Sequence, residues 1–493
     1  MPTGQARFKR LHWSVQILLV FLAGTVLAAA GNYLVHVSSS TTTQKPRSKR
    51  FRPLHRQIKR LRAAGEKMFT PNPGFQRPQS SPMPANSPVT PEITPLPPPP
   101  KRTPTERFLG AAANMMTTSW DHNIFVWLPA FSTDPNSGPT YGILPVLVLS
   151  EPERHHIRQL FAPSYTYNEI FGQTVTGRYY FYPTDQSQLF TIASYSQHTN
   201  REIKLRYENT AFLGGRMFVR AEGYYDADGS LRFFGIGPAT PSGNESGYTG
   251  HNKVIHGDMG VNFLEYWRAS VGLRYRRMGF DPNIVEGIDD ISVRFPQFAN
   301  LPEQNTVVQE FHLLWDSRDI PATPTRGSSG EVFFEKTARD WGSDSDFIRY
   351  GLEGKRFFPW QDGRQNTVIH GLYDWVNGPN IPFYELPELG GRDTLRAFEE
   401  GRFTDKGRIL FNIEQRMELT SLTLMGVTTR FEVGPFFDIG TVFPHPEDMQ
   451  TKYVKPVIGG SFRAVVKPNV VGSIDVGVGN EGVGTYVSIN YPF

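Results

Sequence analysis

The chain has 493 residues, and its mean hydropathy of −0.38 excludes a bundle of membrane helices. It contains no cysteine, which excludes disulfides, thiolate nucleophiles and zinc–thiolate sites within the chain. The net charge of +4 hides an asymmetry, because residues 1–107 hold 17 basic and 3 acidic side chains and leave 34 basic and 44 acidic ones to the remainder. The two parts therefore need separate interpretations.

Residues 1–30 have the three parts of a secretory signal peptide. Basic residues stand at Arg7, Lys9 and Arg10, an apolar run follows over 15–30, and small residues at 28–30 offer a cleavage site. The apolar run is shorter than the roughly 20 residues that a spanning helix needs. We therefore expect a cleaved export signal, and the alternative is an uncleaved inner-membrane anchor.

Residues 31–107 lack the composition of a packed domain. Lysine and arginine crowd residues 45–67, and residues 71–104 contain 13 prolines. Such a segment favours extended polyproline conformations and acts as a spacer. We expect a disordered periplasmic tether, whose basic part is either a solvated tail or a contact for peptidoglycan or another anionic partner.

From residue 108 to the end, short stretches of alternating polar and apolar character recur, each closed by turn residues. This pattern predicts an all-β chain over 108–493 that forms a transmembrane antiparallel β-barrel, because a bilayer forbids open sheet edges. Seventeen stretches qualify, and since bacterial single-chain barrels usually have an even number of strands, we expect about 16. The stretches are 139–150, 157–168, 172–183, 188–197, 201–211, 215–224, 250–264, 267–279, 304–316, 328–338, 344–358, 366–376, 407–419, 428–439, 455–466, 469–479 and 484–493.

The last stretch shows the alternation most clearly. One face of this strand, which runs to the end of the chain, holds Thr485, Val487, Ile489, Tyr491 and Phe493, and the other holds Tyr486, Ser488, Asn490 and Pro492. The first face is mostly apolar and ends in an aromatic residue.

No motif argues for an enzyme, a cofactor, a metal or a nucleic acid. Residues 477–482 (GVGNEG) fit a nucleotide-binding pattern, but they lie in the last predicted hairpin without a following helix. Residues 226–229 (DADG) begin like a calcium loop but lack its later ligands, so they are better explained as a turn.

Three segments resemble the bacterial surface antigen family, the barrels of BamA- and TamA-type outer-membrane assembly proteins. They are residues 315–327 (WDSRDIPATPTRG), residues 390–398 (GGRDTLRAF) with 412–416 (NIEQR) downstream, and residues 436–440 (FFDIG). The resemblance rests on the order and spacing of these segments over residues 304–493. The family's well-known members also have POTRA modules before the barrel, whose patterns residues 31–107 lack.

The resemblance implies a loop that folds into the lumen, where Arg396 meets Asp438 on the inner wall and Glu414 is a second acceptor. A guanidinium matches a carboxylate bidentately, so such a pair suits a lock or gate. On pattern alone, Arg396 could be a solvated loop residue and Asp438 an ordinary lumen carboxylate. Ala397 stands where the family has glycine, so a loop tip of different shape is expected. The other residues assigned to the lock are Gly390, Gly391, Phe398, Phe436 and Gly440, and those assigned to a barrel assembly signal are Ile489, Tyr491 and Phe493.

The resulting expectation is an outer-membrane barrel that assembles membranes or transports a polypeptide or lipid. Its partners would be outer-membrane lipid and the barrel assembly machinery. Two alternatives remain at this point: a structural barrel that anchors the envelope to peptidoglycan through residues 45–67, and a passive pore.

Overall fold

The computed structural model describes residues 117–493 apart from 121–122, 152–155, 185, 299–300, 425–426 and 467–469. The predicted signal peptide and tether lie outside the described residues. None of the helices in the described part is long and apolar enough to cross a bilayer.

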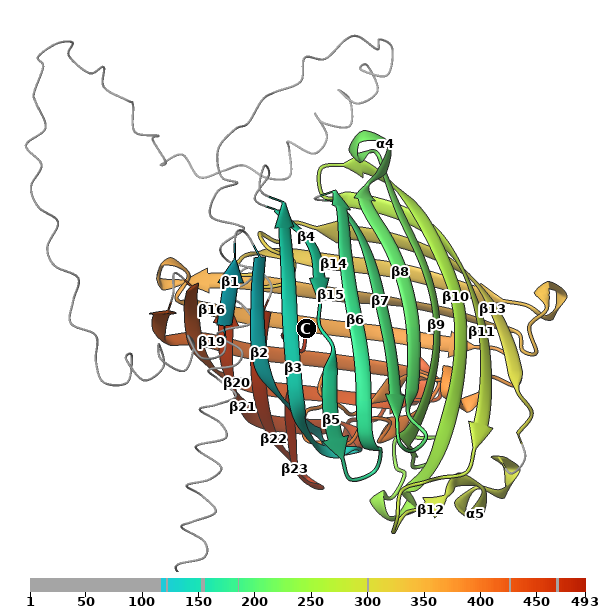
Figure 1. Cartoon of the computed structure of the whole chain (residues 1–493). Helices are drawn as coiled ribbons and strands as arrows, with labels where there is room; N and C mark the ends of the chain where they lie inside the picture. Colours follow the sequence, from blue (N-terminus) through green and yellow to red (C-terminus); the bar gives the residue numbers. More distant parts are fainter. Residues whose placement is uncertain are drawn as a thin grey trace, which may run out of the picture. The chain divides into compact units, whose positions relative to one another are not determined.

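Nearly all of the described strands form one sheet, almost wholly antiparallel, that closes on itself (Figure 1). Successive strands pair with each other, and the first long strand also meets the last. The wall consists of β2 (Asn123–Asp134), β3 (Gly138–Glu151), β4 (His156–Phe161) continued by β5 (Ser164–Asn168), β6 (Gly172–Thr184), β7 (Ser187–Ser196), β8 (Arg201–Ala211), β9 (Met217–Phe233), β10 (Ser246–Leu264), β11 (Trp267–Asp281), β13 (Gln304–Asp316), β14 (Gly327–Thr337), β15 (Phe347–Trp360), β16 (Gln365–Asn377), β19 (Gly407–Leu424), β20 (Val427–Phe443), β21 (Lys455–Val466), β22 (Val470–Gly479) and β23 (Gly482–Ile489).

Short elements occupy the connections. These are the strands β1 (Thr117–Trp120), β12 (Asp289–Asp290), β17 (Glu388–Leu389) and β18 (Phe403–Thr404), the helical turns α4 (Phe212–Gly215) and α5 (Ile291–Arg294), and the 3-10 turns η1 (Ser242–Asn244), η2 (Pro296–Phe298), η3 (Arg339–Trp341), η4 (Gln361–Gly363), η5 (Phe383–Glu385), η6 (Pro446–Asp448) and η7 (Thr451–Tyr453). The long loops 234–245, 282–303 and 378–406 share one end of the barrel, and we call this the long-loop end.

The predicted antiparallel barrel is confirmed, but the count of 16 strands is wrong. With β4 and β5 taken as one interrupted strand, the wall has 18. The sequence pattern missed β2, whose run NIFVWLPAFSTD is apolar on both faces and contains Pro129. With β2 missed, seventeen stretches remained, and the choice of an even number should have been 18 rather than 16.

Alternation along each strand separates lipid-facing from lumen-facing side chains. On β10, Ile255 and Met259 are 68% and 56% exposed. Between them, His256 and Asp258 point the other way and pair with Glu310 of β13 and Arg220 of β9. A water-filled or protein-filled interior accepts such polar groups, whereas the lipid face does not.

The junction of β2 with β23, which we call the seam, is the weakest part of the wall. β23 pairs with β22 at eight positions. It pairs with β2 only where Thr133 faces Val487. A short hairpin strand, β1, covers another part of the β2 edge by pairing with residues 123–126.

Candidate functional site: a loop bound to the inner wall beside the seam

The loop between β16 and β19, residues 378–406, packs against the inner wall of the barrel. Leu395 and Arg396 near its tip have no exposed surface. Leu395 belongs to an apolar cluster with Leu410 of β19 and Phe436 of β20. The loop therefore buries apolar side chains of its own against the wall.

Two glycines shape the loop tip. Gly390 and Gly391 have φ angles of 118° and 89°, which side chains with a Cβ rarely adopt. A Cβ on Gly390 would also lie 2.0 Å from the carbonyl oxygen of Glu399. The amide of Gly391 donates to the carbonyl of Phe398 at 2.9 Å. These contacts close the tip into a compact turn that carries Arg396.

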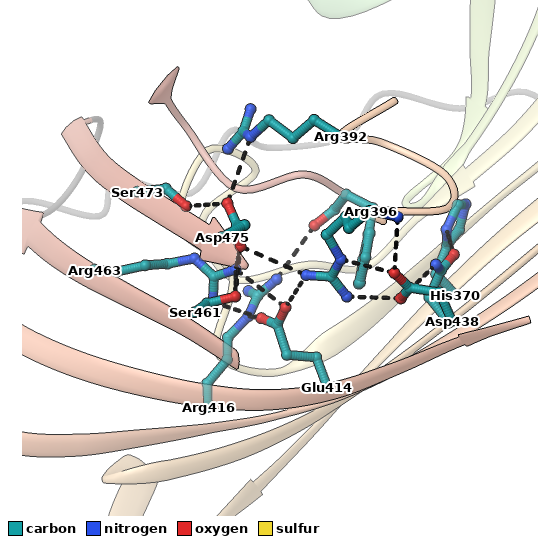
Figure 2. A network of polar contacts seen from close by, with 12 residues as sticks. His370, Arg392, Arg396, Glu414, Arg416, Asp438, Ser461, Arg463, Ser473 and Asp475 are labelled. Atoms are coloured by element: carbon teal, nitrogen blue, oxygen red, sulfur yellow. Dashed lines mark hydrogen bonds and ion pairs between the residues drawn. The ribbon is translucent and has the colours of Figure 1, made fainter. Parts of the chain in front are cut away.

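The structure brings Arg396, Asp438 and Glu414 together (Figure 2). Nε and Nη2 of Arg396 donate to the two oxygens of Asp438 at 2.9 and 2.7 Å. Nη1 donates to Glu414 at 2.6 Å. The planar guanidinium thus uses one edge for a bidentate contact and its remaining nitrogen for a second carboxylate.

Glu414 is the centre of a larger ionic network. Arg463 of β21 donates to both of its oxygens at 2.6 and 3.0 Å, and Arg416 donates to one at 2.8 Å. Arg463 also reaches Asp475 of β22 at 2.9 Å. With Arg396, Asp438 and Arg392, whose Nε lies 3.6 Å from Asp475, the network contains four guanidinium groups and three carboxylates. This mutual pairing offsets part of the cost of burying ions.

Aromatic and amide groups complete the surroundings of Arg396. Its guanidinium carbon lies 3.4 Å from the ring centre of Phe436 and 5.3 Å from that of Phe493. Both distances permit cation–π attraction. The side-chain amide of Asn412 donates at 2.8 Å to Asp438 and at 2.8 Å to the carbonyl of Thr394 in the loop.

The last strand ends before the chain does, so the alternation expected over residues 484–493 stops at Ile489. β23 ends at Ile489, and Asn490 takes a φ of 77°. Tyr491 then donates its hydroxyl to Glu432 at 2.9 Å and lies under the guanidinium of Arg416. The ring centres of Tyr491 and Phe493 lie 3.7 and 5.3 Å from the guanidinium carbons of Arg416 and Arg396, which permits cation–π attraction. The assembly signal assigned to these residues stays a prediction.

The loop contacts both sides of the seam. On the β23 side, Arg392 donates to the carbonyls of Ile489 and Asn490, and the hydroxyl of Tyr486 donates to the carbonyl of Phe398 at 2.5 Å. On the β2 side, the turn after β2 reaches the loop through Asn136. We call this set of contacts the clasp.

The Asn136 contact is reciprocal. The backbone amide of Glu400 donates to the Asn136 side chain at 2.9 Å, and that side chain donates back to the Glu400 carbonyl at 3.1 Å. Between the loop and the seam lies a cavity of about 400 Å³, lined among others by Thr133, Arg392 and Val487.

Two other predicted positions pack around the loop. Phe398 is 2% exposed and meets Phe403 edge to face at 5.0 Å. A Cβ on Gly440 would lie 3.0 Å from Leu389, so this glycine allows the loop to approach β20 closely. Ala397 takes no positive φ, because the left-handed residues around the tip are Gly390, Gly391 and Gly401. Alanine therefore fits this loop without backbone strain.

Sequence reasoning missed Arg416, Arg463, Asp475 and Tyr486. Arg463 and Asp475 both occupy lumen-facing positions of predicted strands, where an isolated charge is costly. The cost of an isolated charge could have been used to predict that Arg463 and Asp475 pair with each other. Nothing in the local sequence indicates that both converge on Glu414, because that contact depends on how three strands align.

One loop carboxyl is poorly stabilised in its charged form. Burial, together with the nearby charge of Glu245, raises the pKa of Glu399 to about 7. Arg232 and Arg402 oppose that rise only in part. Among the described residues, no donor reaches its Oε2 atom.

Comparison with known proteins identifies the family. The Omp85 superfamily domain matches residues 187–492. Solved structures with a similar fold include BamA from Haemophilus ducreyi lacking POTRA domains 1–3, at 12% identity over 78% of this chain and 77% of that chain, with a TM-score of 0.49. CdiB from Acinetobacter baumannii is 12% identical over 75% of this chain and 59% of that one, with a TM-score of 0.35. CdiB from Escherichia coli is 12% identical over 76% and 63%, with a TM-score of 0.39.

The domain match covers more than half of the chain and includes the loop, the ionic network and the last strand. It confirms the resemblance inferred from the three sequence segments. The chain belongs to the Omp85 superfamily and is an outer-membrane β-barrel.

Proposed function

We propose that this barrel assembles or transports a polypeptide or lipid at the outer membrane, with the seam as the route and loop 378–406 as its clasp. The single observation that carries the proposal is the β2–β23 junction, which pairs at one position while the same β23 pairs with β22 at eight. The clasp spans that junction from the lumen side.

The seam is the least costly place to open the wall. Each ladder position lost inside a bilayer exposes backbone groups that lipid cannot satisfy. Parting β22 from β23 removes eight such positions, whereas parting β2 from β23 removes one. The clasp adds the Arg392 and Asn136 contacts, which a loop movement can release together.

An opened seam has the chemistry to receive an extended chain. Exposed strand edges present rows of N–H and C=O groups that pair with an added strand. The same gap joins the lumen to the lipid phase, so an amphipathic lipid can pass with its polar group inside. In this arrangement the N-terminal segment lies in the periplasm, and the barrel assembly machinery is the partner for the protein's own insertion.

Locking the seam tests the proposal. Thr133→Cys with Val487→Cys places two thiols at the one β2–β23 pair found among the described residues, in a chain without native cysteine. The control, Met259→Cys with Val271→Cys, joins β10 to β11, which already pair along their length. Both oxidised proteins are reconstituted into liposomes and assayed for folding of an unfolded outer-membrane barrel precursor and for movement of labelled lipid.

We expect the oxidised seam variant to lose activity and to regain it on reduction, while the control stays active in both states. Full activity with the seam locked would refute the route. An open, steady conductance in planar bilayers without either activity would support the passive pore instead. Deleting residues 31–107 separates envelope anchoring from assembly, since only anchoring needs that segment.

A further inference from the structure

The loop 378–406 reaches the inner wall in two opposite directions. It leaves the wall after β16 and returns at β19. Residues 395–398 contact β19, β20 and β23, on the side of the seam (Figure 2). Residues 383–385 instead contact β9, β11, β13 and β15. β11 is the ninth of the 18 wall strands counted from β2, so it lies on the side of the barrel away from the seam (Figure 1).

Glu385 makes the ionic part of the contact away from the seam. It is 2% exposed, its carboxylate accepts from Nη1 of Arg276 at 3.1 Å, and its carbonyl accepts from the guanidinium of Arg349. Burial raises the pKa of Glu385, but Arg276 above all, with Arg274 and Arg349, holds that pKa below its ordinary value. Within the described residues, none of these side chains takes part in the network around Glu414. The two ionic contacts of the loop can therefore break independently.

The two aromatic residues before Glu385 add further contacts on the same side. Phe383 is 4% exposed, and its ring centre lies 5.0 Å from that of Phe233 on β9. The hydroxyl of Tyr384 donates to Gln304 of β13 at 2.9 Å. Burial of these rings holds the segment to the wall by apolar contact as well as by charge. We call Phe383, Tyr384 and Glu385 the η5 anchor.

A short two-stranded stem separates the η5 anchor from the tip. β17 and β18 pair Glu388 with Thr404 and Leu389 with Phe403. Arg408 of β19 donates to the carbonyl of Glu388 at 2.8 Å, and Leu389 has no exposed surface. The stem is therefore bound to the wall independently of the ionic network at the seam.

Two glycines mark the boundary between the stem and the tip. Gly390 directly follows β17 with a φ of 118°, and Gly401 lies two residues before β18 with a φ of 77°. Residues without a Cβ change backbone conformation at low steric cost, which suits a hinge. Between the glycines, the tip closes on itself through hydrogen bonds such as that from the amide of Phe398 to the carbonyl of Leu395 at 3.0 Å. The tip therefore has the internal bonds of a unit that moves as one body.

We propose that the tip, residues 391–400, turns about Gly390 and Gly401 to leave the seam, while the η5 anchor and the stem stay on the wall. The inference rests on the proposed function, because it names the part of the loop that moves when the seam opens. The movement takes Arg392 and Arg396 away from the wall network. Since the loop stays attached, the return of the tip is an intramolecular step.

Single cysteines report on each part of the loop separately, because the chain has no native cysteine. Ala397→Cys lies in the tip and Leu386→Cys beside the η5 anchor, where the native side chains are 8% and 7% exposed. Each is combined with Arg396→Ala, with Glu385→Gln or with the control Arg339→Ala, whose ion pair is half exposed. All full-length proteins are checked for the heat-modifiable gel shift of a closed barrel. They are then reacted in outer-membrane vesicles with a water-soluble maleimide.

We expect Arg396→Ala to raise the labelling rate of Ala397→Cys about tenfold, because local opening governs access to a buried thiol. Labelling of Leu386→Cys should change by less than about twofold, since the η5 anchor keeps its own partners. Glu385→Gln should act in the opposite sense, and Arg339→Ala should change neither rate. Equal increases at both positions with Arg396→Ala would overturn the proposal, because the loop would then move as one body. Unchanged labelling of Ala397→Cys would overturn it as well.

Arg396→Lys replaces Arg396→Ala if the latter gives no gel shift, because lysine keeps the charge but loses the bidentate fork. The same outcomes apply. Neither variant needs an activity assay. If the oxidised seam variant stays active while the tip alone becomes reactive, the hinge is present and the proposed route is wrong.

Hydrogen exchange of the unsubstituted protein gives a second readout. The amides of Gly391 and Phe398 in the tip, and those of Glu385 and Leu386 at the anchor, all donate to backbone carbonyls. We expect the tip amides to exchange faster, because opening of the hinge exposes them and leaves the anchor closed. Exchange at one common rate for the four amides would overturn the proposal.

Discussion

The guanidinium of Arg396 donates two hydrogen bonds of 2.9 and 2.7 Å to Asp438, its backbone amide donates a third at 3.3 Å, and neither side chain has any exposed surface. A buried ion pair contributes little over a well-packed apolar pair, but removing one partner is costly because the other charge stays buried. The pair therefore determines where the loop sits more than how stable the barrel is.

Replacing the loop arginine should release the loop. We expect Arg396→Ala to destabilise the docked loop by about 3–5 kcal/mol, because Asp438 and Glu414 lose a shared buried partner. The measurement is the temperature at which the folded gel band converts to the unfolded one. Arg339→Ala is the control, since its pair with Asp346 at 3.4 Å is half exposed and contributes about 0–1 kcal/mol. Equal conversion temperatures for Arg396→Ala and Arg339→Ala would contradict the hypothesis that Arg396 locks the loop to the wall.

The two carboxylates should differ in importance. Glu414 contacts Arg396, Arg416 and Arg463, whereas Asp438 has one guanidinium partner, Arg396. We therefore expect Glu414→Gln to lower the conversion temperature more than Asp438→Asn, because it leaves three buried cations with reduced compensation. The reverse order would show that the loop contact, rather than the wall network, dominates.

Close packing of the tip on β23 predicts a steric effect. A Cβ on Gly484 would lie 2.7 Å from the carbonyl oxygen of Arg396, a rigid backbone contact. We expect Gly484→Ala to push the tip off the wall and to increase protease cleavage within residues 390–402. Gly460→Ala on β21 is the matched control, since its Cβ would meet nothing within 4 Å. Cleavage that is unchanged in both variants would mean that the tip is not held there.

The clasp should weaken as the pH rises. The docked loop raises the pKa of Glu399 to about 7 from an ordinary 4.5, chiefly through burial and then through Glu245. The docked state therefore holds this proton more tightly than the released state, and stability is lost as the pH rises through that interval. We expect faster loop proteolysis at pH 8 than at pH 5, and a smaller difference in Glu399→Gln. Glu447→Gln, at an exposed position, should keep the full difference; if Glu399→Gln keeps it too, another group is responsible.

Much of the architecture could be predicted from local patterns in the sequence. Alternation with period two predicted the strand over 250–264, in which the structure has Ile255 outside and His256 inside, because strand geometry sends neighbouring side chains to opposite faces. The motif segments also placed Arg396, Asp438 and Glu414 in one site. The pattern failed for β2, where both faces are apolar, and for the chain end, where Tyr491 and Phe493 leave the strand.

The sequence by itself determined that this chain is a barrel of alternating strands, since periodicity and turn residues are local properties. The inward loop was expected only from the resemblance of three segments to a known family. Only the tertiary structure decided that Arg463 and Asp475 share the network of Glu414, because that depends on the alignment of strands far apart in sequence. It also decided that Thr133 of β2 meets Val487 of β23, which closes the sheet. Whether the first and last strands of a barrel meet depends on the register of every strand pair around it. No single segment of the sequence contains that information.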